Sequence, residues 1–110
     1  MNDLTKQKCM PCEGGTKPFT KKQIQDYLKM TSDWELVSGN PPKIQLKFTF
    51  KDFTEALNFV NKIGRLANAE DHHPDIFIHN YKKVDITLTT HAIGGLSVND
   101  FILAAKINQL

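Results

Sequence analysis

The sequence lacks long apolar runs, has little cysteine and carries little net charge. None of its apolar stretches approaches the roughly 18 residues of a membrane-spanning helix, and the polar start at 1–3 has no signal-peptide core. We therefore expect a cytoplasmic protein in which both cysteines, Cys9 and Cys12, are reduced thiols. A formal charge of +2, with basic and acidic residues interleaved, argues against a nucleic-acid partner.

Familiar catalytic motifs are also missing. The sequence contains no nucleotide-binding glycine loop and no serine or cysteine nucleophile motif. Cys9 and Cys12 form a C-x-x-C pair, but this is only half of the four-sulfur zinc pattern, and nothing later in the chain supplies the other half. We expect two free thiols here, with metal binding as the alternative.

Length and composition predict one domain. The chain has 110 residues, of which 40% are hydrophobic and 24% charged, as in ordinary globular proteins. Residues 1–18 are polar, contain prolines and glycines and show no period, which predicts an irregular arm before a single domain at 19–110. So short a chain leaves much surface exposed, and we expect burial by association into a homodimer or homotetramer.

The first half of the domain reads as a helix followed by two strands. A capping box that starts at Thr20 predicts a helix with an apolar face up to Leu28. A short strand is predicted at 34–37. Apolar and polar residues then alternate over 44–50, which predicts a half-buried strand.

The clearest helix begins after Asp52, which forms a second capping box with Glu55. Pro74 disfavours helical dihedrals at His73, so the helix should end near His72. The apolar residues expected on one side of this helix are Phe53, Ala56, Leu57, Val60, Ile63 and Ala67.

The last third reads as a hairpin and a helix. Strands are predicted at 75–81 and 84–90 around a turn near 82–83, with His91 on the polar face of the second strand. Ser97 and Asp100 can cap a final helix. Its expected core side consists of Val98, Phe101, Ile102 and Ala105.

The element order is helix, strand, strand, helix, strand, strand, helix. Strands joined by short turns pair as antiparallel hairpins, and helices separated from them in sequence collect on one face of the sheet. The order predicts an α+β two-layer sandwich with a four-stranded antiparallel sheet and three helices packed on one face.

Histidine is concentrated where the long helix pattern stops. His72, His73 and His79 fall within eight positions, and His91 follows the next strand pattern. Imidazole titrates near neutral pH, so several histidines around a pocket can exchange protons with a substrate. A histidine at a helix C-terminus can also simply stabilise the helix dipole, and a metal site is a further alternative. The residues alone predict a small α+β domain with a histidine-rich pocket.

The ordered set of motifs resembles the pterin-4a-carbinolamine dehydratases. The resemblance runs from about Trp34 to Leu110, and the arm motif Cys9-x-x-Cys12-x-Gly14-Gly15 is similar to the start of bacterial members. The family fold, a four-stranded antiparallel sheet with three helices on one side, agrees with the element order above. The residues that carry the resemblance are His72-His73-Pro74, Tyr81, Thr89-Thr90-His91, Gly95-Leu96-Ser97 and Asp100.

The resemblance implies a lyase that dehydrates 4a-hydroxytetrahydrobiopterin to quinonoid dihydropterin and so recycles the cofactor of aromatic amino acid hydroxylases. It implies that the reaction needs no metal and no organic cofactor, because the pterin is the substrate. It also implies that the chain could be the partner of such a hydroxylase. By carry-over, His72, His73 and His91 are catalytic and also contact the pterin. Further substrate-binding positions are Pro74, Thr89, Thr90 and Asp100.

Several alternatives stay open at this point. Which histidine is acid and which is base does not follow, and Asp100 fits both a pocket position and the capping box. Asn68 replaces an acidic residue that the family often has, which would weaken substrate binding or rate if that carboxylate contributes. His79 and Asp71 lie near the motif and are assigned no role.

A non-catalytic role is the alternative function. Animal members of the family also act as dimerisation cofactors for a homeodomain transcription factor, so the chain could be a protein-interaction module that uses its helix faces. The stripe Val98, Phe101, Ile102 and Ala105 is the candidate surface, although intramolecular core is the simpler explanation of the same pattern.

Overall fold

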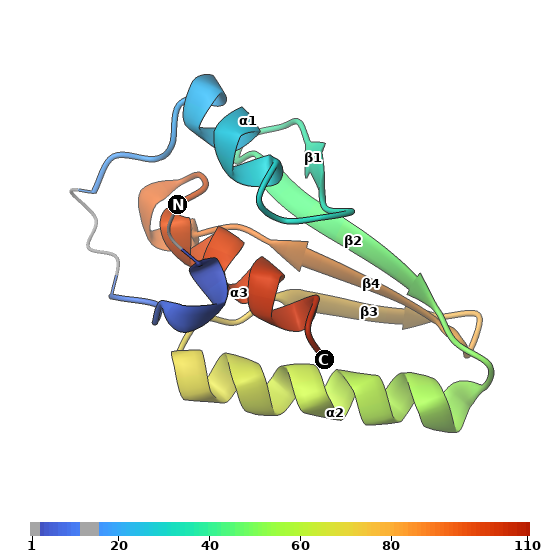
Figure 1. Ribbon diagram of the computed structural model, residues 1–110. Coiled ribbons are helices and arrows are strands. Elements are labelled where there is room, and N and C mark those ends of the chain that lie inside the picture. The colour runs from blue at the N-terminus through green and yellow to red at the C-terminus, as the bar shows by residue number, and fades with distance from the viewer. Residues whose placement is uncertain (1–2, 12–15) are drawn as a thin grey trace.

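A four-stranded antiparallel sheet and three α-helices form the two layers of the structure, a computed structural model that describes residues 3–11 and 16–110 (Figure 1). The strand order is β1-β2-β4-β3. This confirms the predicted α+β sandwich and its element order. The elements are α1 (Lys21–Leu28), β1 (Glu35–Val37), β2 (Lys43–Thr49), α2 (Phe53–Glu70), β3 (Asp75–His79), β4 (Lys83–Leu88) and α3 (Val98–Ile107).

The central strand pair supplies the sheet's side of the core. In β2 and β4, Ile44 lies opposite Leu88 and Leu46 opposite Ile86, so alternate side chains of both strands face the helices. Ile44, Ile86 and Leu88 are fully buried, and each such side chain contributes roughly 1.5–3 kcal/mol through burial. On the other face Gln45 Nε2 donates to Thr87 Oγ1 at 3.0 Å, which forms a polar pair on the outer side of the two central strands.

The long helix α2 packs on the sheet with most of its predicted face, because Ala56, Ile63 and Ala67 are buried and Val60 is partly buried against the core. Phe53 and Leu57, expected in the core, are 48% and 37% exposed. Phe59 and Leu66, which the prediction omitted, are partly buried against the core instead. The buried positions are Ala56, Ile63, Ala67 and Glu70, and their spacing turns the contact face away from the first-turn apolar residues.

The three predicted capping boxes have different outcomes, and the one between Ser97 and Asp100 at the start of α3 forms as predicted. Thr20 and Gln23 form the predicted box at the start of α1. At α2, Asp52 accepts from the Glu55 N–H at 2.9 Å, but the Glu55 side chain accepts from the Lys51 N–H at 3.1 Å rather than from Asp52. Only one of the two hydrogen bonds of the second predicted box is therefore present.

An aromatic cluster joins α1 to α3. The ring centroid of Phe19 lies 4.9 Å from Tyr27 and 5.9 Å from Phe101. Phe101, Ile102 and Ala105 are all buried. The core explanation of the α3 stripe is thus confirmed, and those residues do not form an exposed interaction surface.

The N-terminal arm is more ordered than its composition predicts. A short 3-10 helix, η1 (Leu4–Lys6), lies within the stretch predicted to be irregular, and Leu4 is 4% exposed and joins the core. The blue segment in Figure 1 runs beside α3, in agreement with the contacts between η1 and α3. Cys12 and the Gly14-Gly15 pair lie outside the described residues.

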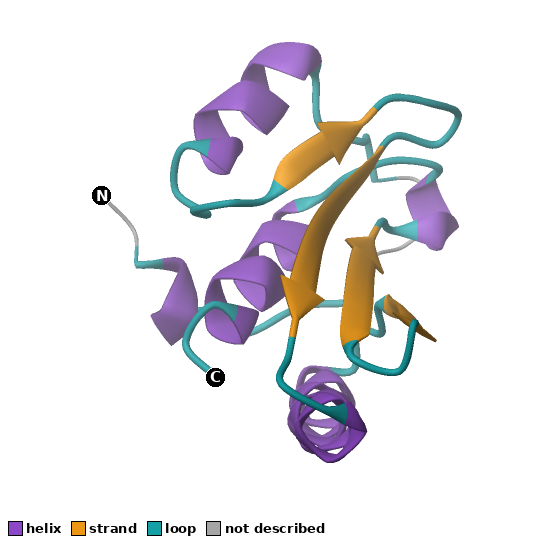
Figure 2. Ribbon diagram, turned by 90° about the vertical axis from the view of Figure 1, so that its right-hand side faces the viewer, coloured by secondary structure: helices purple, strands orange, loops and turns teal. Residues whose placement is uncertain are grey.

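The second hairpin belongs to the sheet drawn in orange in Figure 2. Both of its strands are shorter than predicted. β3 ends at His79, and the turn uses Asn80 and Tyr81 in left-handed conformations, with φ of 49° and 52°. β4 ends at Leu88, so His91 is not on the strand but begins a second 3-10 helix, η2 (His91–Ile93).

Candidate active site

The end of α2 brings two histidines out of the helix. Asp71 follows the last helical residue in a left-handed conformation, with φ 53° and ψ 40°, which aspartate tolerates better than most residues. Its N–H and that of His72 both donate to the carbonyl of Ala67, the latter over 3.2 Å. The chain therefore turns at Asp71, and His72 lies just past the helix end, as predicted, with His73 next to it.

Asp100, in the first turn of α3, holds His72 from the interior. Its Oδ1 lies 2.7 Å from His72 Nε2, and the Asp100 side chain is fully buried while that of His72 is 12% exposed. Oδ2 accepts from the Thr90 hydroxyl at 2.8 Å and from the Ser97 N–H at 3.0 Å. Because both oxygens have donors, the cost of burying the carboxylate is offset. Asp100 thus both caps α3 and contacts a histidine.

The chain after β4 approaches the same place from another direction. The Thr90 N–H donates to the Gly95 carbonyl at 2.9 Å and closes a short loop. The Thr89 hydroxyl donates to the Pro42 carbonyl at 2.9 Å, so it is engaged in holding the loop. Both threonines are buried, whereas His91 is exposed in the loop they anchor.

Gly95 is required by close packing at the base of this loop. A Cβ placed on it would lie 2.7 Å from the Pro18 Cβ, closer than two carbon atoms can approach without a shift. The Phe19 N–H also donates to the Leu96 carbonyl at 2.8 Å. The segment before α1 therefore fixes the loop that carries His91.

These elements line an open cavity of about 240 Å³. Five of the predicted site residues line it, namely His72, His73, Thr89, Thr90 and His91. Pro74 and Asp100 are not among the lining residues, although Asp100 contacts His72 from behind. The complete lining is Met10, Pro11, Asp71, His72, His73, Thr89, Thr90, His91, Ala92 and Asn99.

Sequence reasoning missed four of the lining residues, Met10, Pro11, Ala92 and Asn99, and had assigned no role to Asp71. Met10 and Pro11 belong to the arm, where no periodicity marks a contact. Asn99 had one available signal, because it is a polar residue between two apolar-face positions of a buried helix, and it is only 4% exposed.

The other two histidines have different surroundings. Nε2 of His73 lies 3.0 Å from Oδ1 of Asn68, so the residue that departs from the family pattern contacts a candidate catalytic group. His79 lies outside the cavity, with Nε2 3.2 Å from Asp85 Oδ1. The structure brings three of the four histidines together and separates the fourth.

A second polar cluster adjoins the cavity around Glu70, the last residue of α2. Its Oε1 accepts from the Cys9 N–H at 2.8 Å, and its Oε2 from Lys106 Nζ at 2.9 Å. Burial alone would raise the pKa of the Glu70 carboxyl, but these hydrogen bonds and the positive charge of Lys106 hold the pKa below its usual range.

The surroundings of the Cys9 thiol disfavour its ionisation. Burial, and next the negative charge of Glu70, raise the pKa of Cys9 to about 12. Its Sγ donates to the Asn99 carbonyl over 3.6 Å. Across residues 3–11 and 16–110, no group of three or more His, Cys, Asp or Glu side chains is arranged to hold a metal ion.

Comparisons with known proteins agree on one family. The model described as pterin 4 alpha carbinolamine dehydratase matches residues 17–110. A protein of Alkaliphilus metalliredigens assigned as a pterin-4-alpha-carbinolamine dehydratase is 43% identical over 110 residues, covering 99% of this chain and 96% of its own length. The mitochondrial pterin-4-alpha-carbinolamine dehydratase 2 of Arabidopsis thaliana is 41% identical, covering 98% of this chain and 59% of the plant protein.

Solved structures show the same fold. A transcriptional coactivator/pterin dehydratase from Brucella melitensis superposes with a TM-score of 0.77 at 33% identity, covering 84% of this chain and 97% of that one. A pterin dehydratase-like protein described as a RuBisCO assembly factor of the alpha-carboxysome gives a TM-score of 0.60 at 23% identity, over 70% of this chain and 87% of its own. At that identity the second likeness concerns the fold alone.

Proposed function

This chain belongs to the pterin 4 alpha carbinolamine dehydratase family, and from that premise we propose that it removes water from 4a-hydroxytetrahydrobiopterin to give quinonoid dihydropterin, by histidine acid–base catalysis. The observation that carries the proposal is the convergence of His72, His73 and His91 on one cavity. They come from two segments that are separate in the sequence, the end of α2 and the loop after β4, and only the fold makes them neighbours.

The reaction needs two proton movements. The carbon–oxygen bond breaks as the hydroxyl leaves with a proton, and the adjacent ring nitrogen loses its proton as the carbon–nitrogen double bond forms. Histidines can deliver the first proton and accept the second near neutral pH, with no metal or organic cofactor in the proposed reaction.

The buried carboxylate suggests which histidine accepts. With its ring N–H on Nε2 donating to Asp100, His72 keeps Nδ1 as the nitrogen with a free lone pair. His72 is therefore our candidate base, and His73 or His91 the acid that protonates the leaving hydroxyl. Asp100 acts through His72 and is a positioning residue.

Asn68, in place of the acidic residue that the family often has, changes the surroundings of His73. An amide oxygen at this position accepts a hydrogen bond from His73, but it lacks the net charge by which a carboxylate would stabilise a protonated imidazole. If His73 is the acid, this chain holds its reactive proton with less electrostatic help than relatives with an acidic residue there.

The biological setting remains part of the proposal. We place the reaction after that of an aromatic amino acid hydroxylase, in the cytoplasm, and the homodimer or homotetramer expected from the chain's size stays a prediction. In the described part of the chain, none of the helices combines the length and apolar character required to cross a bilayer.

The test is a rate measurement on 4a-hydroxytetrahydropterin that a hydroxylase generates in place. Wild-type protein should accelerate water loss over buffer. His72→Ala, which removes the base, and whichever of His73→Ala and His91→Ala removes the acid should each lower kcat by roughly 10²- to 10⁴-fold, the usual contribution of a general acid or base. His79→Ala is the matched control, because His79 lies outside the cavity, and should retain wild-type rates. A folded wild-type protein without any acceleration would refute the dehydratase proposal.

One observation favours a second candidate function. The Brucella relative is described as both a coactivator and a dehydratase, and α2 of this chain exposes Phe53 and Leu57, large apolar residues one turn apart. An interaction module would use such a surface rather than the buried α3 stripe. Partner binding that survives His73→Ala but is lost in Phe53→Ser would support it.

A further inference from the structure

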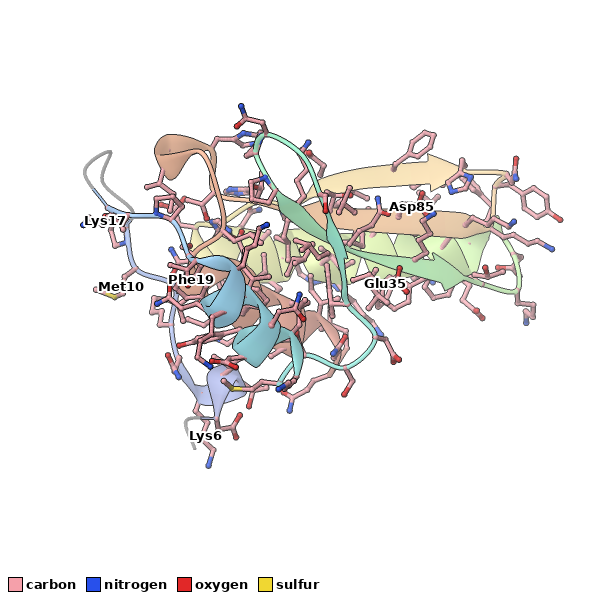
Figure 3. All side chains as sticks on the ribbon, turned by 90° about the horizontal axis from the view of Figure 1, so that it is seen from above. Lys6, Met10, Lys17, Phe19, Glu35 and Asp85 are labelled. Carbon is pink, nitrogen blue, oxygen red and sulfur yellow. The ribbon has the colours of Figure 1, made fainter. Side chains whose placement is uncertain are left out.

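One wall of the cavity comes from the N-terminal arm. Met10 and Pro11 line it together with the histidines, although they lie about 60 positions earlier in the chain. Met10 is 67% exposed, an unusual exposure for a large apolar side chain, and Figure 3 shows it at the end of the molecule where the arm passes. The arm therefore presents an apolar surface at the rim of an otherwise polar pocket.

A single side chain fixes this wall. Asn99 Oδ1 accepts from the Met10 N–H at 3.0 Å, and Asn99 Nδ2 donates to the Met10 carbonyl at 2.5 Å. One amide thus satisfies both backbone groups of one arm residue, as a neighbouring strand would. Asn99 directly precedes Asp100, so adjacent residues of α3 hold the arm and His72.

Further contacts hold the arm just before Met10. The Cys9 N–H donates to Glu70, which is also paired with Lys106, and Lys8 Nζ donates to the Ala69 carbonyl at 3.3 Å. These bonds connect the arm to the end of α2, the helix that delivers His72 and His73. The arm is therefore fixed to both helices that carry the site.

We propose that the arm is a built wall of the pterin pocket, in which Met10 contacts the bound substrate and Asn99 is the positioning residue. The inference rests on the proposed function. A flat, conjugated bicyclic ring has two apolar faces, and a polarizable thioether beside a proline ring suits such a face, whereas the histidines and threonines suit the polar edges.

The chemistry of these residues determines which kinetic constant they affect. Neither Met10 nor Pro11 can exchange a proton, so we expect the arm to contribute binding energy that the substrate and the transition state share. Removal of such uniform binding raises KM and leaves kcat unchanged. This distinguishes the arm from the histidines, whose loss lowers kcat.

Asn108, at the other end of α3, is a closely matched control for Asn99. Its Oδ1 accepts from Trp34 Nε1 at 3.0 Å and its Nδ2 donates to the Ser32 carbonyl at 3.0 Å. It therefore also ties a distant segment to α3 through both ends of one amide, but it does not line the histidine cavity. Asn108→Ala removes the same kind of contact without touching the proposed wall.

The experiment measures kcat and KM for dehydration in wild type, Met10→Ala, Asn99→Ala and Asn108→Ala, with urea unfolding of each protein. Met10→Ala and Asn99→Ala should raise KM about 10-fold with kcat within about twofold, the size of effect expected for a few lost apolar contacts. Asn108→Ala should leave both constants unchanged. Met10 is exposed, so Met10→Ala should leave the core unchanged. An unchanged KM in this variant would overturn the proposal, as would a lower kcat with no change in KM.

Binding of 7,8-dihydrobiopterin, a pterin that cannot react, separates this inference from the proposed function. If wild type binds it without catalysing dehydration, weaker binding by Met10→Ala still supports the wall while the dehydratase proposal fails. If wild type dehydrates its substrate but the variant binds and turns over normally, the wall alone is rejected. If wild type neither binds nor reacts, both proposals fall.

Discussion

Two histidine–aspartate pairs in this chain have the same residue types and very different surroundings. His72 and Asp100 meet at 2.7 Å beside the cavity, and His79 and Asp85 lie 3.2 Å apart on the outer face of the sheet. In Figure 3, Asp85 lies on the sheet well away from Met10, which lines the cavity. The pairs therefore serve as an internal comparison.

The difference lies in what holds the carboxylate. Asp100 is fully buried and its second oxygen has two donors of its own, whereas Asp85 is 17% exposed. Nε2 of His79 has no hydrogen-bond partner among the described residues, despite its closeness to Asp85, and its ring stacks on the exposed Phe77 at 4.8 Å. Proximity alone brings a carboxylate and an imidazole into contact. A carboxylate that is itself held in one orientation also determines which ring nitrogen of the histidine carries the proton.

The largest expected contrast is in catalysis. Asp100→Asn replaces one acceptor oxygen with an NH₂ group, so either His72 or the Thr90 and Ser97 donors lose a partner. We expect kcat to fall by roughly 10²- to 10³-fold, because His72 loses its preferred tautomer and orientation. Steady-state dehydration rates as a function of pH check this, since a positioning role should also change the shape of the pH profile.

Asp85→Asn provides the control for that measurement. Its rate and pH profile should match those of wild type, because Asp85 contacts no cavity residue. Equal rate losses in the two variants would show that the comparison is mistaken and that both effects arise from general destabilisation.

The next contrast is in stability. Asp100→Ala leaves the His72, Thr90 and Ser97 donors without their acceptor in the interior, and should lower the free energy of unfolding by about 3 kcal/mol. Asp85→Ala should cost about 0.5 kcal/mol, as for partly exposed ion pairs. Urea unfolding at neutral pH measures both, and a cost for Asp85→Ala as large as that for Asp100→Ala would remove the distinction.

The smallest contrast concerns a buried carboxylate whose partner is a lysine instead of a histidine. Glu70 is buried and paired with Lys106, and Glu70→Gln should cost about 1–2 kcal/mol at neutral pH. Because folding lowers the pKa of Glu70 from its ordinary 4.5, this stabilisation is complete above about pH 4.5 and is lost as the pH falls through the lower, folded pKa. The difference in unfolding free energy between wild type and Glu70→Gln should therefore shrink only below pH 4.5, and an equal difference at all pH values would contradict it.

The sequence predicted the features that depend on local pattern. The histidines at 72 and 73 follow a helix that a proline must end, so their place at a corner could be inferred from backbone rules alone. The alternation over 44–50 likewise predicted β2 and its buried face, and the element order predicted the two layers.

The features that were missed depend on contacts between distant segments. Most of the predicted face of α2 is correct, but Phe53 and Leu57, which have the correct period, are exposed, a fact that only packing determines. His91 was placed on a strand because the alternation continues to residue 90, whereas the bridge from Thr90 to Gly95 ends the pairing earlier. Met10 and Pro11 carry no period at all, and the hydrogen bonds from Asn99 to Met10 show where the arm lies.

The Asn99 clamp also has a consequence for the order in which the molecule is assembled during synthesis. It joins residues 89 positions apart, and closing a loop of that length costs about 4 kcal/mol of chain entropy, which is recovered only when the segments between are already folded. A nascent chain that has completed the hairpin of β3 and β4 still lacks Asp100 and the clamp. The pocket therefore cannot form until the segment that carries Asn99 and Asp100 has left the ribosome.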